Sequence, residues 1–417
     1  MNPDRLVAGL DIGSAKTTAI IAELEGDLPK HPKIKLLGVG QARTTGMRRG
    51  VVSDIEETTR SIRKAMQDAE RMAGAQVAEV YAGIAGEHVQ AMTSKGIVAV
   101  SHDEIDKSDV DRANEVARAQ AIPQDRELLH AIPQEYSVDK DHGIRDPIGM
   151  SGTRLETEMY LVTIGSSPAI NLRKSVERAG YKVRELVLEP LASALAVLTE
   201  DEKELGVGLV EMGAGTTDIA VFHEGKIRHL GTVAFGGNNV TSDIVHGLGV
   251  TQADAERLKE RYGCAYEPLV DPSDVIQLPS TVAQGDRQIP RELLAHIIHQ
   301  RMDEIFDMVQ RDVASAGFAG KLSAGIVLTG GAAAMEGSAE LAADVFGTGV
   351  RVGIPSENLS GLVDSVEAPR FATAVGLAQY GGSRLALGGA TATRRTPLSK
   401  GIEGVGAKIK FWLQDFF

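Results

Sequence analysis

Residues 7–21 read VAGLDIGSAKTTAII, and residues 207–222 read VGLVEMGAGTTDIAVF. Each stretch consists of an apolar strand, an acidic residue, a glycine-containing turn and a second apolar strand. Downstream, VVSDI at 51–55 resembles VTSDI at 240–244, and both segments run into helical periodicity. Hairpins with glycine turns can look alike by chance, but here two separate segments repeat in the same order. The repeat therefore predicts two related halves in an α/β fold.

The composition is that of a folded protein without disulfides. The chain has 417 residues, 43% of them hydrophobic, which is enough for about two to four domains. A net charge of −13 without a long Lys/Arg run argues against nucleic-acid binding. The single cysteine, Cys264, cannot form a disulfide within one chain, and no Cys/His cluster predicts structural zinc. Because no apolar run approaches 18 residues, any membrane association is expected to be peripheral.

Hydrophobic periodicity predicts strands with glycine-rich turns, followed by helices. Strands are expected near 6–12, 18–24, 34–41, 77–84, 158–164, 206–212, 217–222 and 325–329. Helices are expected near 54–73, 108–120, 168–180, 190–200, 238–248, 251–262 and 290–316.

The two glycine-containing turns have the residue types of phosphate-binding loops. Glycine allows a tight turn whose backbone N–H groups point at one anion, and hydroxyl and lysine side chains add donors. The predicted contacts are Gly13, Ser14, Ala15, Lys16 and Thr17 in the first loop, and Gly213, Ala214, Gly215, Thr216 and Thr217 in the second. Asp11 and Glu211, at the strand ends, are placed to meet Mg²⁺ or its water shell. Two such hairpins facing each other would hold the polyphosphate of ATP.

Three further segments are assigned to the nucleotide. The strand end VLTGGAA at 327–333 lets backbone approach a flat base, although an ordinary turn before a helix is the alternative. An acidic and a basic residue lie one helical turn apart within 255–259, where a solvated ion pair is the alternative. The residues predicted on these segments, together with a glycine pair before the helix at 238–248, are Gly236, Gly237, Glu256, Lys259, Gly330, Gly331 and Ala332.

The hairpins, together with LTGGAAAMEG at 328–337 and two connecting helices, EPLASAL at 189–195 and ATAVGL at 372–377, resemble the actin/Hsp70/hexokinase ATPase superfamily. Within that superfamily, several segments resemble the FtsA family of bacterial cell-division proteins. These segments are GQARTTGMRRGVVSDIEE at 40–57, HAIPQEYSVD at 130–139, GIRDPIGMSG at 143–152 and VLTEDEKELGVGLVEMGAGTTDIAVF at 197–222. The resemblance runs from about residue 5 to residue 385 and resumes at the tail.

The resemblance implies an actin-like two-domain ATPase fold with two ribonuclease-H-like halves. The first core is expected at 1–82, completed by 164–204 and 361–384, with a small inserted subdomain at 83–163. The second core is expected at 205–235 and 297–360, with a small subdomain at 236–296. A flexible linker at 385–400 and an amphipathic helix at 401–417 would follow.

The resemblance also implies a function. It predicts ATP binding with Mg²⁺ and head-to-tail polymers on the inner face of the cytoplasmic membrane at the division site. The implied partners are further copies of the chain, later division proteins, anionic lipid and the C-terminal peptide of the tubulin-like protein FtsZ. FtsZ is expected to dock on 236–296, whereas the insert at 83–163 is expected to contact neighbouring subunits or division partners.

The expected catalytic residues are Asp11, Glu189 and Glu211. The superfamily usually begins its second loop with aspartate, and this chain departs from that pattern at Glu211 and also carries Ala214 where glycine is common. Misplacing the attacking water by about 1 Å can cost on the order of 100-fold in rate. We therefore expect ATP binding with at most slow hydrolysis. Glu189 could hold the water instead, and a structural helix cap before Pro190 is its alternative role.

Two alternative functions share the superfamily fold. One is a sugar or acetate kinase, which would need an acceptor pocket and a catalytic base in the cleft. The other is a different actin-like scaffold, such as the pilus-assembly protein PilM. The PQEY and GMRRG segments and the tail favour the FtsA family, and a kinase has no use for the tail.

The tail is predicted to lie in a membrane interface as an amphipathic helix. At about 100° per residue, its apolar side chains fall within one arc of about 140°, with a lysine on either side. The predicted membrane contacts are Ile402, Val405, Lys408, Ile409, Lys410, Trp412, Leu413, Phe416 and Phe417. The alternative is a helix docked on the protein's own core. The gross gain from burial nearly cancels the cost of ordering the tail, so a monomer should bind reversibly.

Overall fold

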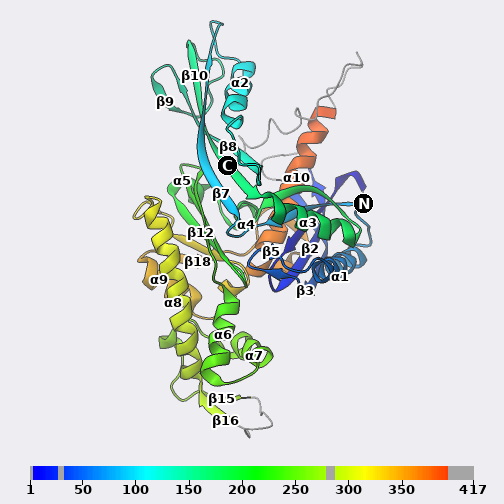
Figure 1. Cartoon of the computed structure of the whole chain (residues 1–417), viewed down its shortest axis with the longest axis vertical. Coiled ribbons are helices and arrows are strands. Elements are labelled where there is room, and N and C mark those ends of the chain that lie inside the picture. Colours follow the sequence, from blue (N-terminus) through cyan, green and yellow to red (C-terminus); the bar gives the residue numbers. More distant parts are fainter. Residues whose placement is uncertain (1–2, 27–31, 279–286, 393–417) are drawn as a thin grey trace.

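A computed structural model of the chain describes residues 3–26, 32–278 and 287–392. Two sheets form the cores of two halves, and a third sheet projects from them (Figure 1). The insert that carries the third sheet and the small β15–β16 hairpin lie at opposite ends of the elongated molecule (Figure 1).

The first half is built on a six-stranded sheet with the order β11-β6-β1-β2-β3-β19. Its strands are β1 (Leu6–Ile12), β2 (Lys16–Glu25), β3 (Lys33–Arg43), β6 (Glu79–Ile84), β11 (Lys182–Leu188) and β19 (Leu359–Gly361). Helices α1 (Ile55–Ala73) and α3 (Ser166–Ala179) cover one face, and α4 (Glu189–Val197) and α10 (Ala372–Ala392) cover the other. Both faces are covered because successive side chains of a strand point to opposite faces of the sheet. On β2, Ile21 packs with α1, and Ile20 packs with α4 and α10.

The second half repeats this strand order as β18-β17-β12-β13-β14. Its strands are β12 (Val207–Met212), β13 (Thr217–His223), β14 (Lys226–Val233), β17 (Ile326–Thr329) and β18 (Val350–Val352). Helices α6 (Gly237–Leu248), α7 (Gln252–Tyr262), α8 (Arg291–Ser315) and α9 (Ser338–Phe346) follow, with the hairpin β15 (Val275–Leu278) and β16 (Arg287–Pro290). Because β12 and β13 occupy the positions of β1 and β2, the predicted duplication and actin-like α/β fold are confirmed.

The insert has its own sheet, with the order β7-β10-β8-β9. It comprises β7 (Val89–Ala99), α2 (Lys107–Arg118), β8 (Arg126–Val138), β9 (Asp141–Ile144) and β10 (Arg154–Gly165). Helix α2 packs closely on β7, since a Cβ on Gly96 would overlap the Ala113 carbonyl oxygen. The predicted insert boundaries of 83–163 stay a prediction, and the sheet ends at Gly165.

Short elements connect these layers. They are η1 (Pro3–Arg5), β4 (Met47–Arg48), β5 (Val51–Val52), α5 (Glu200–Leu205), η2 (Glu267–Leu269), η3 (Ala332–Ala334), η4 (Val363–Val366) and η5 (Pro369–Phe371). The predicted helix at 190–200 is in fact two helices, because α4 ends at Val197 and Thr199 caps α5 through the Glu202 amide.

The predicted linker at 385–400 is wrong over residues 385–392, because α10 continues to Ala392. Glycines and threonines suggested a flexible segment, but alanine and leucine favour a helix. Leu385, Ala386 and Leu387 pack against the core between the two sheets, and this contact outweighs the local glycines. Residues 393–400 and the predicted membrane helix at 401–417 lie outside the described residues.

Within the described ranges, no helix is both long and apolar enough to cross a membrane.

Candidate functional site

A cavity of about 590 Å³ lies between the two halves. This volume is within the range of small-molecule sites. Both glycine turns, the first turn of α4, helix α7 and the turn after β17 contribute to its wall. The sequence-predicted residues that line it are Asp11, Gly13, Ser14, Ala15, Lys16, Glu189, Glu211, Gly213, Ala214, Gly215, Thr216, Gly237, Glu256, Lys259, Gly330, Gly331 and Ala332.

Three predicted contacts do not line the cavity. The Thr17 hydroxyl is buried against the Thr44 hydroxyl at 2.7 Å, and the Thr217 hydroxyl donates to the Phe235 carbonyl at 2.9 Å. Successive strand side chains point to opposite faces, so the residue that follows each turn can point away from the cavity. Gly236 instead supports the second turn from behind, where a Cβ would lie 2.6 Å from the Gly213 carbonyl oxygen.

The two glycine turns have the same backbone geometry and lie against each other. The Gly13 amide donates to the Lys16 carbonyl at 3.1 Å, and the Gly213 amide donates to the Thr216 carbonyl at 2.9 Å. A Cβ on Gly215 would lie 2.8 Å from the Ser14 Oγ. Glycine at 215 thus allows the two turns to approach.

The β4–β5 turn is a part of this junction that sequence reasoning missed. Arg49 and Gly50 both have positive φ, 49° and 75°, which is uncommon for a residue with a side chain. The Gly50 amide donates to the Ser14 Oγ at 3.4 Å, and a Cβ on Gly215 would lie 3.1 Å from the Arg49 amide nitrogen. The GMRRG segment was a visible signal, but nothing in the sequence placed it beside both phosphate loops.

Four carboxyl groups surround one end of the cavity. Burial, reinforced by the charge of Glu211, raises the pKa of Asp11 to about 8. Burial also raises the pKa of Glu211 to about 7 and that of Asp218 to about 6, against hydrogen bonds that lower both values. Burial and then the Asp11 charge raise the pKa of Glu189 well above its usual value. Clustered, dehydrated carboxyls of this kind favour a bound cation.

Among the described residues, two of these carboxyls have hydrogen-bond donors and two do not. Glu211 accepts hydrogen bonds from the Ser193 hydroxyl at 2.8 Å and from the Thr373 hydroxyl. Asp218 accepts from the Thr216 and Thr232 hydroxyls at 2.9 Å and 2.7 Å.

Within the described ranges, the side-chain carboxylates of Asp11 and Glu189 line the cavity and accept no hydrogen bond. Asp218, Ser193 and Thr373 were not assigned from the sequence. Only Asp218 carried a signal, since it ends the echoed hairpin turn.

The pair on α7 is more than a solvated ion pair. The Lys259 Nζ lies 2.8 Å from the Glu256 carboxylate, 2.8 Å from the Thr241 hydroxyl and 3.1 Å from the Gly237 carbonyl oxygen. Its side chain is only 11% exposed. Lys16 reaches across the cavity mouth to Glu260 at 3.8 Å, with both side chains more than half exposed. One lysine therefore fixes α7 against the start of α6, while the other bridges the two halves loosely.

The turn after β17 brings bare backbone to the cavity. Gly330 has φ of 88°, and a Cβ there would lie 2.5 Å from the Met212 carbonyl oxygen, so glycine is required. Apart from its chain neighbours, no described residue has an atom within 4 Å of a Cβ built on Gly331. This open backbone is compatible with the predicted adenosine contact.

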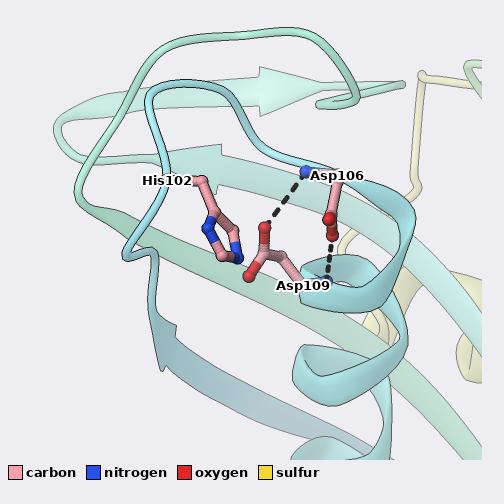
Figure 2. A group of neighbouring side chains, drawn as sticks. All are labelled: His102, Asp106 and Asp109. Atoms are coloured by element: carbon pink, nitrogen blue, oxygen red, sulfur yellow. Dashed lines mark hydrogen bonds between the residues drawn. The ribbon is translucent and has the colours of Figure 1, made fainter.

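Among the residues that the structure describes, one group could bring three ligand atoms together for a metal: His102, Asp106 and Asp109 (Figure 2). Its carboxylates are already engaged in a capping box of α2. Asp106 accepts from the Asp109 amide at 3.1 Å, and Asp109 accepts from the Asp106 amide at 3.0 Å. These bonds account for the cluster as a helix cap.

Comparison with known proteins identifies the family. The model for "Cell division protein FtsA" matches residues 208–376, and that for "SHS2 domain inserted in FTSA" matches 86–163. The chain is 39% identical to Cell division protein FtsA of Pseudomonas aeruginosa, covering 99% of this chain and 98% of that protein. It is 38% identical to the Escherichia coli K12 protein of the same name, covering 99% and 98%.

Solved structures with little sequence identity share the fold. The PilM-PilN type IV pilus biogenesis complex matches with a TM-score of 0.64 at 16% identity, covering 90% of this chain and 98% of that chain. MreB5 of Spiroplasma citri bound to ADP matches with a TM-score of 0.54 at 15% identity, covering 90% and 95%. The chain is thus an actin-like cell-division protein, and it belongs to the FtsA family.

Proposed function

We propose that the chain binds ATP with Mg²⁺ in the cavity between its halves. The observation that carries the proposal is the meeting of two glycine turns of equal geometry beside two carboxylates, those of Asp11 and Glu189, that accept no hydrogen bond from the described residues. Backbone amides of such turns bind phosphate oxygens, and carboxylates bind Mg²⁺ directly or through water.

The residues divide by chemistry. The turns at 13–16 and 213–216 would bind the phosphates, with Lys16 adding a positive charge at the mouth. Asp11 and Glu189 would hold Mg²⁺ or its waters, since neither carboxylate accepts a hydrogen bond from a donor in the described part of the chain. The metal would offset phosphate charge when bound. The backbone at Gly330 and Gly331 would approach the adenosine.

Hydrolysis is expected to be slow at most. Glu211 was the sequence candidate for the second metal-facing carboxylate, but hydroxyls of α4 and α10 engage both of its oxygens. Asp11 and Glu189 are then the carboxylates left to orient a water. A kinase of the same fold would respond to its acceptor, so phosphate release that rises on addition of sugars or acetate would favour that alternative.

Titration with a fluorescent ATP analogue tests the site. Gly215→Val places side-chain atoms where the two turns meet, and we expect loss of affinity on the order of 100-fold. Gly349→Val is the matched control, because no atom lies within 4 Å of a Cβ there. Unchanged ATP affinity in Gly215→Val would contradict the assignment of the two turns as the phosphate-binding site.

We further propose that polymers of the chain tether FtsZ to the inner face of the cytoplasmic membrane at the division site and recruit later division proteins. The support is membership of the FtsA family together with the amphipathic pattern at 401–417. Single tails bind reversibly, and head-to-tail assembly would array many tails and raise their avidity.

Co-sedimentation with anionic vesicles tests the tail. Wild type should pellet, whereas Trp412→Glu and a truncation after Lys400 should remain largely in the supernatant. If both variants pellet as well as wild type does, the tail is not the anchor.

Crosslinking tests the FtsZ site. A peptide from the C-terminus of FtsZ should label residues 236–296, the segment that contains α6, α7 and the β15–β16 hairpin. Labelling confined to 83–163 would contradict this placement and would assign FtsZ to the insert.

A further inference from the structure

Glu211 lies where the two connecting helices meet. It is the penultimate residue of strand β12 and is 7% exposed. Its Oε2 accepts from Ser193 Oγ on α4 at 2.8 Å, and its Oε1 accepts from Thr373 Oγ1 on α10. One buried carboxyl of the second half therefore joins both helices that run between the halves.

The two helices cross in direct backbone contact at the same place. A Cβ on Gly376 would overlap the carbonyl oxygen of Ala192, so no side chain separates the helices. Ala192 precedes Ser193, and Gly376 lies one turn after Thr373. The hydroxyls that hold Glu211 thus flank the crossing. A small rotation of one helix against the other would move the two hydroxyls apart.

Helix α10 also contacts the first hairpin. A Cβ on Gly9 would lie 2.5 Å from the Ala374 carbonyl oxygen, and Gly9 is two residues before Asp11 on β1. The first turn of α10 therefore touches the strand of one phosphate hairpin and is hydrogen-bonded to the carboxyl of the other. Any change in the spacing of the two hairpins must be accommodated at this turn.

The length of the side chain matters. An aspartate is shorter by one carbon–carbon bond, about 1.5 Å, and would not bring both oxygens to hydroxyls on two helices. Asp11, the counterpart of Glu211 on the first hairpin, has no such partners within the described ranges.

We propose that Ser193 and Thr373 are positioning residues that fasten Glu211 to the crossing of α4 and α10. Glu211 then connects the nucleotide cavity to this crossing, which would act as the hinge between the halves. The effect on nucleotide affinity rests on the proposed nucleotide binding. The hydrogen bonds that fasten Glu211 to the two helices do not depend on nucleotide. Because coupling is reciprocal, loosening the hinge changes nucleotide affinity, and bound nucleotide changes the hinge.

Hydrogen exchange of the full chain without nucleotide tests the fastening. Thr373→Val removes the hydroxyl at constant shape, and Thr373→Ser retains it. We expect exchange within 189–197 and 372–387 to quicken on the order of tenfold in Thr373→Val and to match wild type in Thr373→Ser. The control is Thr59→Val, which removes a buried hydroxyl bonded to Ser175 on the far face of the first sheet.

A second background shows whether the effect passes through Glu211. In Glu211→Leu, Thr373→Val should add little further exchange, since the acceptor is already absent. Ser193→Ala should reproduce the effect in case Thr373→Val does not fold. Equal exchange in wild type, Thr373→Val and Ser193→Ala, or a full effect of Thr373→Val in Glu211→Leu, would overturn the proposal.

ATP titration of the same variants separates this proposal from the nucleotide site. We expect Thr373→Val to weaken ATP binding on the order of tenfold and Thr373→Ser to restore it. If wild type binds no ATP, the proposed function fails, while the exchange result still decides on the fastening. ATP affinity that is the same in Thr373→Val and wild type would contradict the coupling.

Discussion

The hairpins β1–β2 and β12–β13 match in backbone and differ in chemistry. Each closes a glycine turn with one amide-to-carbonyl bond, and each places an acidic residue next to last in its first strand. Asp11 has no hydrogen-bond partner within the described ranges, whereas Glu211 is bonded to hydroxyls from two helices. The repeat thus fixes where a phosphate can bind, and the surrounding helices decide what each carboxyl does.

The largest expected effect is a difference between Asp11 and Glu211 in how much each contributes to Mg²⁺-dependent ATP affinity. Asp11→Asn should reduce the gain in ATP affinity that Mg²⁺ supplies by on the order of 100-fold, as for groups that hold a metal through water. Glu211→Gln should reduce that gain by less than about tenfold, because its partners are protein hydroxyls. Isothermal titration with ATP, with and without Mg²⁺, measures both. Equal losses in the two variants would remove the distinction.

A second effect concerns the pH dependence of stability without nucleotide and metal. The folded-state pKa values of Asp11 and Glu211 are raised to about 8 and about 7 from 3.8 and 4.5. The stability that these groups contribute is fully present below the unfolded values and is lost as pH rises through the folded values. Stability should therefore fall as the pH rises from about 4 to about 8.

The two carboxyls should differ within that pH range. Asp11→Asn should flatten the decline up to about pH 8, and Glu211→Gln only up to about pH 7. Urea midpoints at pH 5, 6, 7 and 8 in the presence of EDTA measure the decline. A decline in Asp11→Asn as steep as that of wild type would show that this carboxyl does not titrate as described.

The smallest effect concerns the two lysines of the cleft. Lys16 is more than half exposed and 3.8 Å from Glu260, so Lys16→Gln should cost less than about 0.5 kcal/mol of stability. Lys259 is 11% exposed with three oxygen partners, and Lys259→Gln should cost about 1–3 kcal/mol. Thermal unfolding compares the variants. If Lys16→Gln lost more stability than Lys259→Gln, Lys16 would be the structural lysine, and the roles given to the two residues would be wrong.

The local sequence pattern predicted the two related halves and their glycine turns, because the strand, the acidic residue and the glycine turn of each hairpin are contiguous in the sequence. It did not predict the partners of Glu211, since Ser193 and Thr373 come from helices 18 and 162 residues away along the chain. Thr17 and Thr217 were assigned by adjacency to the turns, and the strand alternation turned them away. The linker prediction was wrong at 385–392 because composition does not show that α10 packs there against a core made by both halves.

A structure of the full chain with a non-hydrolysable ATP analogue and Mg²⁺ would show where the phosphates and the metal bind. We predict the phosphates between the turns at 13–16 and 213–216, the metal on the side of Asp11 and Glu189, and Glu211 still bonded to Ser193 and Thr373. Phosphates bound away from the two turns, or Glu211 released from both hydroxyls to the metal, would contradict the account.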